Sequence, residues 1–323
     1  MSPWIPALCT GLGVLFLAAL ALGDQTIPPL DVIGALIGEE GPTGIIVTQL
    51  RLPRAIIGAI VGAALGLAGA VCQTIMRNPL ADPGIIGINA GAALAATLVI
   101  VEIGSLPESI LPVASFTGAL AATVGIFALS WRNGTTSLRL ILVGIGISAF
   151  AGACASFIST FGEVAAVQRA MVWLAGSLRD SRWDRLPELI GWMLPACLLI
   201  AFGARELDLI VLGDDVARGR GQPVNLVRIA LLFGTAMICG AAVAAAGLIA
   251  FVGLAAPHIA RGLVGQRHAA LLPASALTGA LLVLAADLIA RRALAPVQLP
   301  VGIVTAMLGA PFFGVLLWRR RND

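Results

Sequence analysis

Arginines and one aspartate near the ends of long apolar runs are the residues of this sequence best placed for chemistry. Arg51 and Arg54 stand close together at the start of one run, and Asp287 shortly precedes Arg291 near the end of another. A guanidinium group binds carboxylates in a bidentate geometry that lysine cannot match, so these arginines suit a partner that carries carboxylates. Anchoring at a membrane interface explains the same positions, and position alone favours anchoring.

Catalytic and metal chemistry find little support. Asp287 lies beside an arginine rather than alone in mid-span, which favours a structural ion pair over a proton relay. His258 and His268 are the only histidines, and the five cysteines are scattered singly through apolar runs. Neither a metal-ligand spacing nor an HExxH or GxSxG motif occurs. We therefore predict that the chain is not an enzyme and holds no metal.

A further charged cluster lies in the longest polar connection, residues 205–228. Asp214 and Asp215 stand near the start of a short segment, and Arg218 stands near its end. Acidic residues at the start and a basic residue at the end suit a short capped helix. Such a helix between two membrane spans could contact a cytoplasmic partner, and a solvated connector is the alternative.

The composition defines the setting of these clusters. Of 323 residues, 59% are hydrophobic and 11% are charged, against roughly 25% charged in a soluble domain. The chain is therefore predicted to be an all-α membrane protein that crosses the lipid bilayer many times. It has 20 arginines and no lysine, so it cannot form a phosphate-binding loop that needs a lysine and is predicted to have no ATPase site of its own. The net charge of +3 gives no reason to expect a nucleic-acid partner.

The charged residues divide the apolar sequence into about ten spans. The predicted spans are 4–23, 54–77, 85–101, 110–131, 139–163, 189–204, one or two spans within 229–257, then 269–290 and 299–318. As a single helix, 229–257 would be about 43 Å long, well beyond a 30 Å hydrocarbon core, and Gly253 and Pro257 favour a break. Ten spans with both termini in the cytoplasm also place more arginines inside than nine spans do. Gly58, Gly62 and Gly66 share one helix face, which favours close packing within the bundle over a dimer seam.

Longer motifs carry a resemblance to a known family. The sequence resembles the FecCD family, whose members are permease subunits of ABC importers for ferric siderophores, haem and cobalamin. Three of the matching segments are Arg51-Leu52-Pro53-Arg54, residues 212–218 around Asp214, and Leu299-Pro300-Val301-Gly302. The most specific match is a run after Arg77 together with a later pair: Asn78, Pro79, Leu80, Ala81, Asp82, Pro83, Gly84, Pro257 and His258. The resemblance covers residues from about 45 to 318.

The resemblance implies a fold and a set of partners. The fold is a single permease domain over residues 1–323, of the type II ABC importer kind. The partners are a second permease subunit (the same chain or a sister chain), two cytoplasmic ABC ATPases that hold ATP and Mg²⁺, and an extracytoplasmic substrate-binding protein. The location is the cytoplasmic (inner) membrane of a bacterium. No cofactor is expected in this chain.

The resemblance also assigns residues to roles. Arg51, Arg54 and Arg291 match positions that dock the binding protein, which reverses the preference for anchoring. The ATPase-coupling residues are Leu212, Gly213, Asp214, Asp215, Val216, Ala217 and Arg218, although the following Gly219-Arg220-Gly221 is more basic than the family pattern. The pathway and gate residues are Met171 and Trp173 on the outer side and Thr135, Thr136 and Ser137 on the inner side. The expected cargo is a ferric siderophore, with haem or cobalamin as the alternative. A carrier that works without an ATPase is a hypothesis from another class.

Overall fold

The computed structural model describes residues 3–39, 41–84, 86–103, 109–132 and 134–320, and its regular elements are helices. In these residues the one pairing of extended backbone is an isolated bridge between Leu294 and Val297. The prediction of an all-α fold is confirmed.

The helices follow one another with short connections. The first half of the chain contains α1 (Trp4–Ala21), α2 (Pro29–Leu36), α3 (Pro42–Ile45), η1 (Ile46–Arg51), α4 (Leu52–Ile75), α5 (Ile88–Leu98), η2 (Val99–Ile103), α6 (Ile110–Ser130) and α7 (Ser137–Phe161). The second half contains α8 (Val164–Leu174), η3 (Trp183–Arg185), α9 (Leu186–Phe202), α10 (Ala204–Val211), α11 (Asp214–Gly219), α12 (Val224–Ala246), α13 (Val252–Val264), α14 (His268–Arg292) and α15 (Val301–Arg320).

The predicted spans correspond to these helices. Within the described residues, seven helices are long and apolar enough to cross a membrane. The shorter apolar helices Ile88–Ile103, Val252–Val264 and Val301–Val315 fall where the remaining three spans are predicted. Ile85, the expected start of the third span, lies outside the described residues. The second span begins earlier than predicted, because a helix continues from Pro42 to Ile75 and proline is favoured in a first helical turn.

The predicted break in 229–257 exists, but its predicted position is wrong. Helix α12 ends at Ala246 and α13 begins at Val252, and the connection has positive φ at Gly247 (68°) and Phe251 (66°). Gly247 is required there because a Cβ would lie 2.4 Å from the carbonyl oxygen of Trp173. Pro257 lies inside α13. Its missing N–H leaves the Gly253 carbonyl without that helical donor, and this carbonyl packs against Gly69 of α4.

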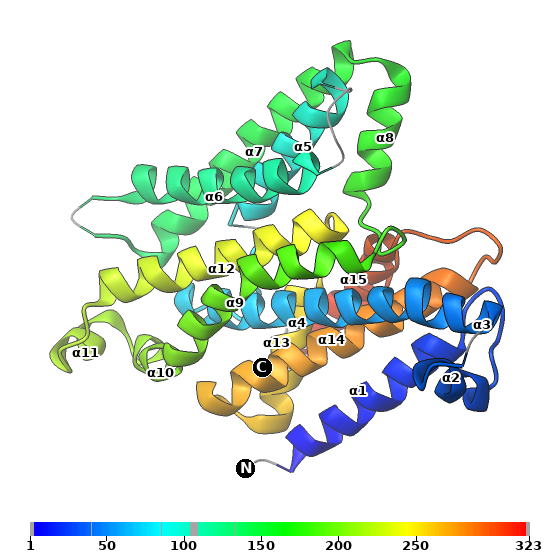
Figure 1. Ribbon diagram of the computed structural model, residues 1–323. Coiled ribbons are helices and arrows are strands. Elements are labelled where there is room, and N and C mark those ends of the chain that lie inside the picture. The colour runs from blue at the N-terminus through cyan, green and yellow to red at the C-terminus, as the bar shows by residue number, and fades with distance from the viewer. Residues whose placement is uncertain (1–2, 40, 85, 104–108, 133, 321–323) are drawn as a thin grey trace.

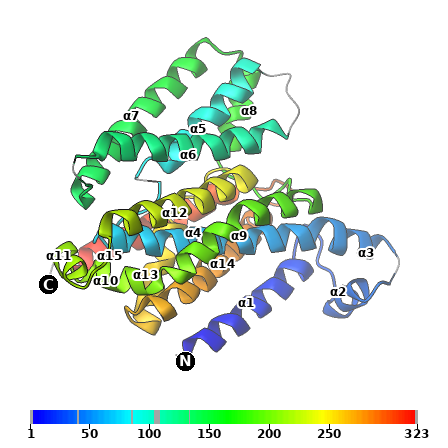
Figure 2. The same cartoon turned by 60° about the vertical axis from the view of Figure 1, so that its left-hand side comes forward.

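Helix α4 runs through the middle of the bundle. In both views it lies with α9 and α12, between a group formed by α5, α6, α7 and α8 and a group formed by α1, α13 and α14 (Figures 1 and 2). A Cβ on Gly62 would lie 2.4 Å from the carbonyl oxygen of Gly279, and one on Gly66 would lie 2.1 Å from that of Ser275. The glycine face therefore packs against α14 of the same chain, which confirms packing within the bundle.

The two ends of α4 carry different structures. Figure 1 shows α2 and α3 at one end of the bundle and α10 and α11 at the other. We call these the outer end and the inner end, following the orientation that the arginine distribution predicts. Arg51 and Arg291 lie at the outer end, and Arg77 and Asp214 lie at the inner end.

Candidate functional site

A cavity of about 1460 Å³ opens at the outer end of the bundle. Two carboxylates, Asp24 and Asp180, are among its lining residues. Arginines outnumber them: Arg51, Arg54, Arg169, Arg179, Arg182, Arg185 and Arg291. The excess of guanidinium groups gives the cavity a positive potential, which favours an anionic ligand or an acidic protein surface.

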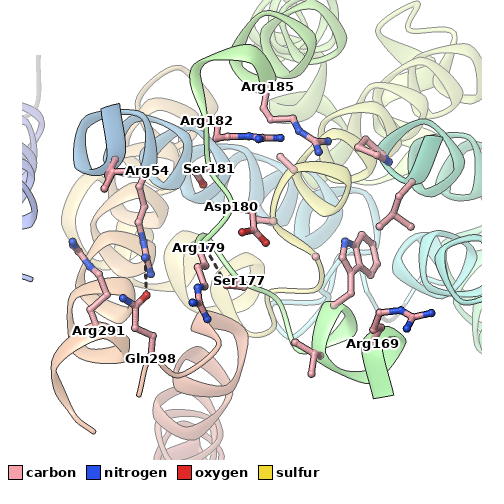
Figure 3. Close-up of a pocket in the computed structure, with 18 of the residues that line it drawn as sticks. Arg54, Arg169, Ser177, Arg179, Asp180, Ser181, Arg182, Arg185, Arg291 and Gln298 are labelled. Atoms are coloured by element: carbon pink, nitrogen blue, oxygen red, sulfur yellow. Dashed lines mark hydrogen bonds between the residues drawn. The ribbon is translucent and has the colours of Figure 1, made fainter. Parts of the chain in front are cut away.

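Asp287 is the centre of a buried ion cluster on one side of this cavity. Asp287 is 1% exposed, and its side chain accepts hydrogen bonds from Arg54, with Nη2 at 2.8 Å from Oδ1. Arg291, one helical turn later on α14, places Nε 3.1 Å from Oδ2. Arg54 also donates to Gln298 at 2.9 Å (Figure 3). Asp287 therefore holds α4 and α14 together as a paired structural carboxylate.

Two of the three arginines predicted to dock a partner are also bound to the C-terminal end of α1. Arg51 donates to the carbonyl oxygens of Leu20 (2.7 Å) and Ala21 (2.9 Å), and Arg291 donates to that of Ala19 (3.2 Å). These carbonyls belong to the last turn of α1, where helical donors are missing and a cation is favoured. Arg51, Arg54 and Arg291 are only 8%, 9% and 5% exposed. Docking through them stays a prediction.

More accessible arginines line the cavity on α8 and on the connection between α8 and α9. Arg169 on α8 and Arg179 and Arg182 on the connection are exposed. Figure 3 shows Arg54 and Arg291 on one side of the cavity and Arg169 on the other, with Arg179 and Asp180 between them. The sequence reading did not select these arginines, although their density within residues 163–188 was a usable signal.

The two predicted outer pathway residues differ in position. Trp173 is half-buried in the cavity wall, whereas Met171 is 64% exposed and is not among the lining residues. Both lie in the last turn of α8, which ends at Leu174. Their roles stay predictions.

The predicted short helix at the inner end is present as α11, directly after Gly213. Asp214 forms ion pairs with Arg77 and Arg228. The predicted gate residues lie nearby, just before and at the start of α7. Thr135 is buried, Thr136 caps α7 by accepting from the Arg139 N–H at 3.4 Å, and Ser137 donates to the Ile75 carbonyl at 2.8 Å.

The family-motif residues organise the connection between α4 and α5. Asn78 Oδ1 accepts from the Leu80 N–H at 2.9 Å, and Asp82 Oδ1 accepts from the Gly84 N–H at 2.8 Å, so both side chains fix local turns. A Cβ on Gly253 would lie 2.7 Å from Asp82 Oδ2, which places this connection against the start of α13. Burial raises the pKa of the Asp82 carboxyl, and the bond from Gly84 opposes that shift.

Other motif and polar residues of α13 and α14 have structural contacts. The His258 ring meets Phe312 edge to face, with centroids 6.0 Å apart. His268 is 1% exposed, with Nδ1 2.6 Å from Asp208 Oδ1 and Nε2 2.7 Å from Thr74 Oγ1. This triad joins α4, α10 and α14. Both partners of His268 are distant in sequence, so local spacing gives no signal for this triad.

The fold and the site together define a polytopic helical membrane protein with a positive outer cavity and a short exposed helix at its inner end. The model of the FecCD transport family matches residues 11–319. The chain therefore belongs to the FecCD transport family.

Named relatives are similar over nearly their whole length. The iron(3+)-hydroxamate import system permease protein of Bacillus subtilis (strain 168) is 38% identical over 314 residues, which cover 95% of this chain and 94% of the relative. The hemin transport system permease protein of Yersinia pestis is 38% identical over 98% of this chain and 97% of its own. A solved structure described as an inward-facing conformation of a metal-chelate type ABC transporter superposes with a TM-score of 0.88 at 30% identity, covering 98% of each chain.

Proposed function

We propose that this chain is the transmembrane permease subunit of an ABC importer for a ferric siderophore. The observation that carries the proposal is the arginine-rich outer cavity in a FecCD chain, opposite the short helix α11. Ferric siderophores are bulky, and many carry negative charge. The volume of about 1460 Å³ exceeds the roughly 300–1,000 Å³ of ordinary small-molecule pockets, and guanidinium groups suit the oxygen atoms of such a chelate.

The proposed assembly adds two ATPases and a second permease subunit to this chain. Two cytoplasmic ABC ATPases bind ATP and Mg²⁺ and act on α11, through Asp215, Val216 and Arg218, which are exposed. A second permease subunit completes the pathway, and the segment 135–137 forms its inner gate. Nucleotide-driven closure of the ATPases favours one of two conformations and so changes which side is open.

An extracytoplasmic binding protein delivers the chelate to the outer end. We propose that it docks over the cavity mouth, because the cavity is lined by the buried Arg51, Arg54 and Arg291 and by the exposed Arg179 and Arg182. The buried arginines hold α1, α4 and α14, so they act on docking both by charge and by the position of those helices. The exposed arginines can pair directly with carboxylates of the partner.

Uptake of labelled chelates tests the function. A strain that lacks this chain is complemented with the unsubstituted gene and offered ⁵⁵Fe-loaded hydroxamate siderophore, ferric citrate, hemin and cobalamin. ATP-dependent uptake of an iron chelate supports the proposal. Uptake of hemin or cobalamin alone would mean that haem or cobalamin is the cargo. Transport by the purified chain without any ATPase would refute the importer assignment.

Charge reversal tests the docking surface in the same strain. Arg51→Glu with Arg54→Glu changes buried positions, Arg179→Glu with Arg182→Glu changes exposed ones, and Arg267→Glu is the control on an exposed connection between α13 and α14. We expect both pairs to lower uptake with the protein still in the membrane, and the control to retain it. Normal uptake with both reversed pairs would refute docking at this mouth.

A further inference from the structure

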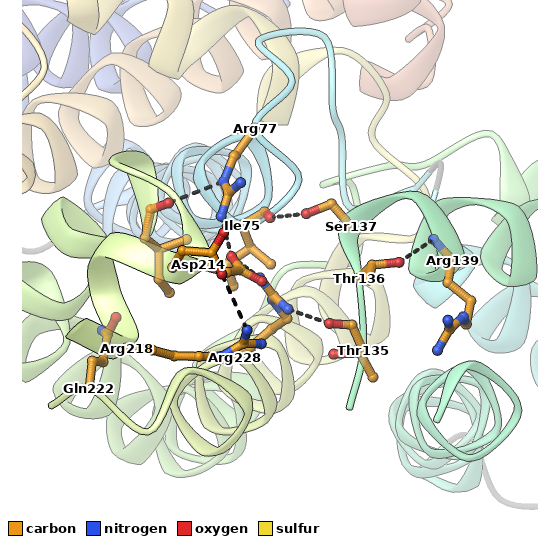
Figure 4. Close-up of polar contacts among 12 residues, drawn as sticks. Ile75, Arg77, Thr135, Thr136, Ser137, Arg139, Asp214, Arg218, Gln222 and Arg228 are labelled. Carbon is orange, nitrogen blue, oxygen red and sulfur yellow. Dashed lines mark hydrogen bonds and ion pairs between the residues drawn. The ribbon is translucent and has the colours of Figure 1, made fainter. Parts of the chain in front are cut away.

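One buried guanidinium at the inner end joins helix α11 to the segment before α7. Asp214, the first residue of α11, accepts hydrogen bonds from Nη2 of Arg228 at 2.9 and 3.1 Å. Nη1 of the same side chain donates to the Thr135 carbonyl at 2.6 Å. Figure 4 shows Arg228 between these two partners. A single planar cation on α12 therefore spans the short helix and the segment 135–137.

A second route joins the same parts through the end of α4. Arg77 pairs with Asp214 and donates through Nε to the Ile210 carbonyl at 3.2 Å. Its backbone has a φ of 48°, which a non-glycine residue seldom adopts and which the surrounding contacts must hold in place. Two residues earlier, the Ile75 carbonyl accepts from Ser137 at 2.8 Å. The two routes close a ring of polar contacts between α11, α4, the segment 135–137 and α12.

Burial makes this connection stiff. Arg228 is 0% exposed, and the Asp214 side chain is 22% exposed. Charge-assisted bonds from a forked guanidinium are short and directional, and water cannot replace them readily at a buried site. Movement of α11 along the membrane surface must therefore move Arg228 and the Thr135 backbone or break these bonds.

We infer that Arg228 is a positioning residue that transmits movement of α11 to the segment 135–137, with Asp214 as its anchor on α11. The inference rests on the proposed function, in which α11 contacts the ATPase and this segment is the inner gate. The exposed side chains of α11 receive the movement, whereas Asp214 and Arg228 pass it on. Loss of either charge removes this link, so we expect α11 and the segment to move independently.

The test uses the complete transporter, assembled with its ATPases and partner permease in lipid nanodiscs. A single reporter, Leu138→Cys in a background without the five native cysteines, stands on the first turn of α7, where Leu138 is 67% exposed. Its maleimide labelling rate is compared without nucleotide and with ATP and vanadate, and ATP hydrolysis is measured on the same samples. The variants are Arg228→Gln, Asp214→Asn and Arg228→Lys, with Arg267→Gln as the exposed control.

We expect nucleotide to change the labelling rate in the parent and in Arg267→Gln. In Arg228→Gln and Asp214→Asn the change shrinks by about fivefold or more, the lower end of common coupling between sites, while ATP hydrolysis continues. Arg228→Lys is intermediate because an ammonium keeps the charge but not the forked contact.

Two results would overturn the inference. One is a full nucleotide response in Arg228→Gln and Asp214→Asn. The other is loss of ATP hydrolysis together with the response in both variants, which would mean that the pair maintains the ATPase interface rather than transmits its movement. A parent complex with no nucleotide response and no hydrolysis would instead refute the proposed function.

Discussion

The substitution Gly69→Ala tests the packing of α4 against α13. A Cβ on Gly69 would lie 1.7 Å from the carbonyl oxygen of Gly253 and 2.5 Å from its carbonyl carbon. Since Cβ contacts under 3.0 Å are essentially never seen, the backbones must separate by about 1.3 Å. A gap of roughly 0.5–1 Å already forfeits a quarter to a half of a dispersion contact.

Neighbouring interactions add to this cost. The same separation stretches the bond from Gln73 Nε2 to the Leu254 carbonyl, which is 3.2 Å long. No flexible side-chain end is available to move aside, because the atoms nearest to the new Cβ are all backbone. We therefore expect a loss of about 3 kcal/mol or more in the free energy of unfolding, the upper end of the range for overpacking.

The assay is unfolding in mixed micelles of mild detergent and SDS, followed by tryptophan fluorescence. Gly58→Ala is a graded comparison, because its new Cβ would meet the side-chain ends of Leu178 (2.9 Å) and Leu284 (3.4 Å), and we expect a loss of about 1 kcal/mol. Gly13→Ala on α1 meets nothing within 4 Å and should change stability by less than about 0.5 kcal/mol. Equal stability of Gly69→Ala and Gly13→Ala would refute the close approach.

Three further substitutions have expected outcomes. Asp287→Asn leaves Arg54 and Arg291 buried without their counter-charge and should lower the free energy of unfolding by about 3–5 kcal/mol in the same assay; an unchanged midpoint would mean that the cluster is open to water. His268→Ala removes the group between Thr74 and Asp208 and should cost about 1–3 kcal/mol, with faster amide hydrogen exchange in α10 as its local signature. Arg169→Glu should lower chelate uptake without changing the unfolding midpoint, and normal uptake would exclude that arginine from the cavity's function.

The order of most spans could be predicted because charged residues separate most of the long apolar runs, although no charge separates α12 from α13 within 229–257. The glycine face of α4 could also be predicted as a packing surface, since the spacing of Gly58, Gly62 and Gly66 places them on one side of a helix. The position of the break between α12 and α13 could not. Sequence rules treat Pro257 as a helix breaker, whereas the fold accepts it by packing the Gly253 carbonyl against Gly69.

The candidate site was only partly predictable, for a physical reason. Local patterns find the short helix α11 and the arginines at membrane boundaries, because those signals lie within a few residues of each other. The partners of these residues are distant in sequence: Arg54 pairs with Asp287, and Arg228 contacts both Thr135 and Asp214. Long-range ion pairs depend on which helices become neighbours, and that follows from packing rather than from spacing along the chain.

The absence of lysine gives the arginines of this chain more than one kind of role. Arg51 and Arg291 use several donors to bind the last carbonyls of α1, and Arg139 likewise donates to the Ser130 and Gly134 carbonyls beyond α6. A lysine ammonium could approach one such carbonyl but could not match two in the plane of a fork. Arg51 and Arg291 also border the outer cavity, so their positive charge and their structural contacts cannot be altered separately by charge reversal.

Comparison of conservative and reversing substitutions separates these two effects. Arg51→Lys keeps the positive charge but loses the forked contact with α1, whereas Arg182→Lys keeps the charge at an exposed position on the connection between α8 and α9. If docking depends on charge alone, both lysine variants retain uptake. If the position of α1 matters as well, Arg51→Lys lowers both uptake and stability, and Arg182→Lys lowers neither. Loss of uptake in Arg182→Lys with normal uptake in Arg51→Lys would contradict both expectations. It would mean that docking requires the forked guanidinium of the exposed Arg182.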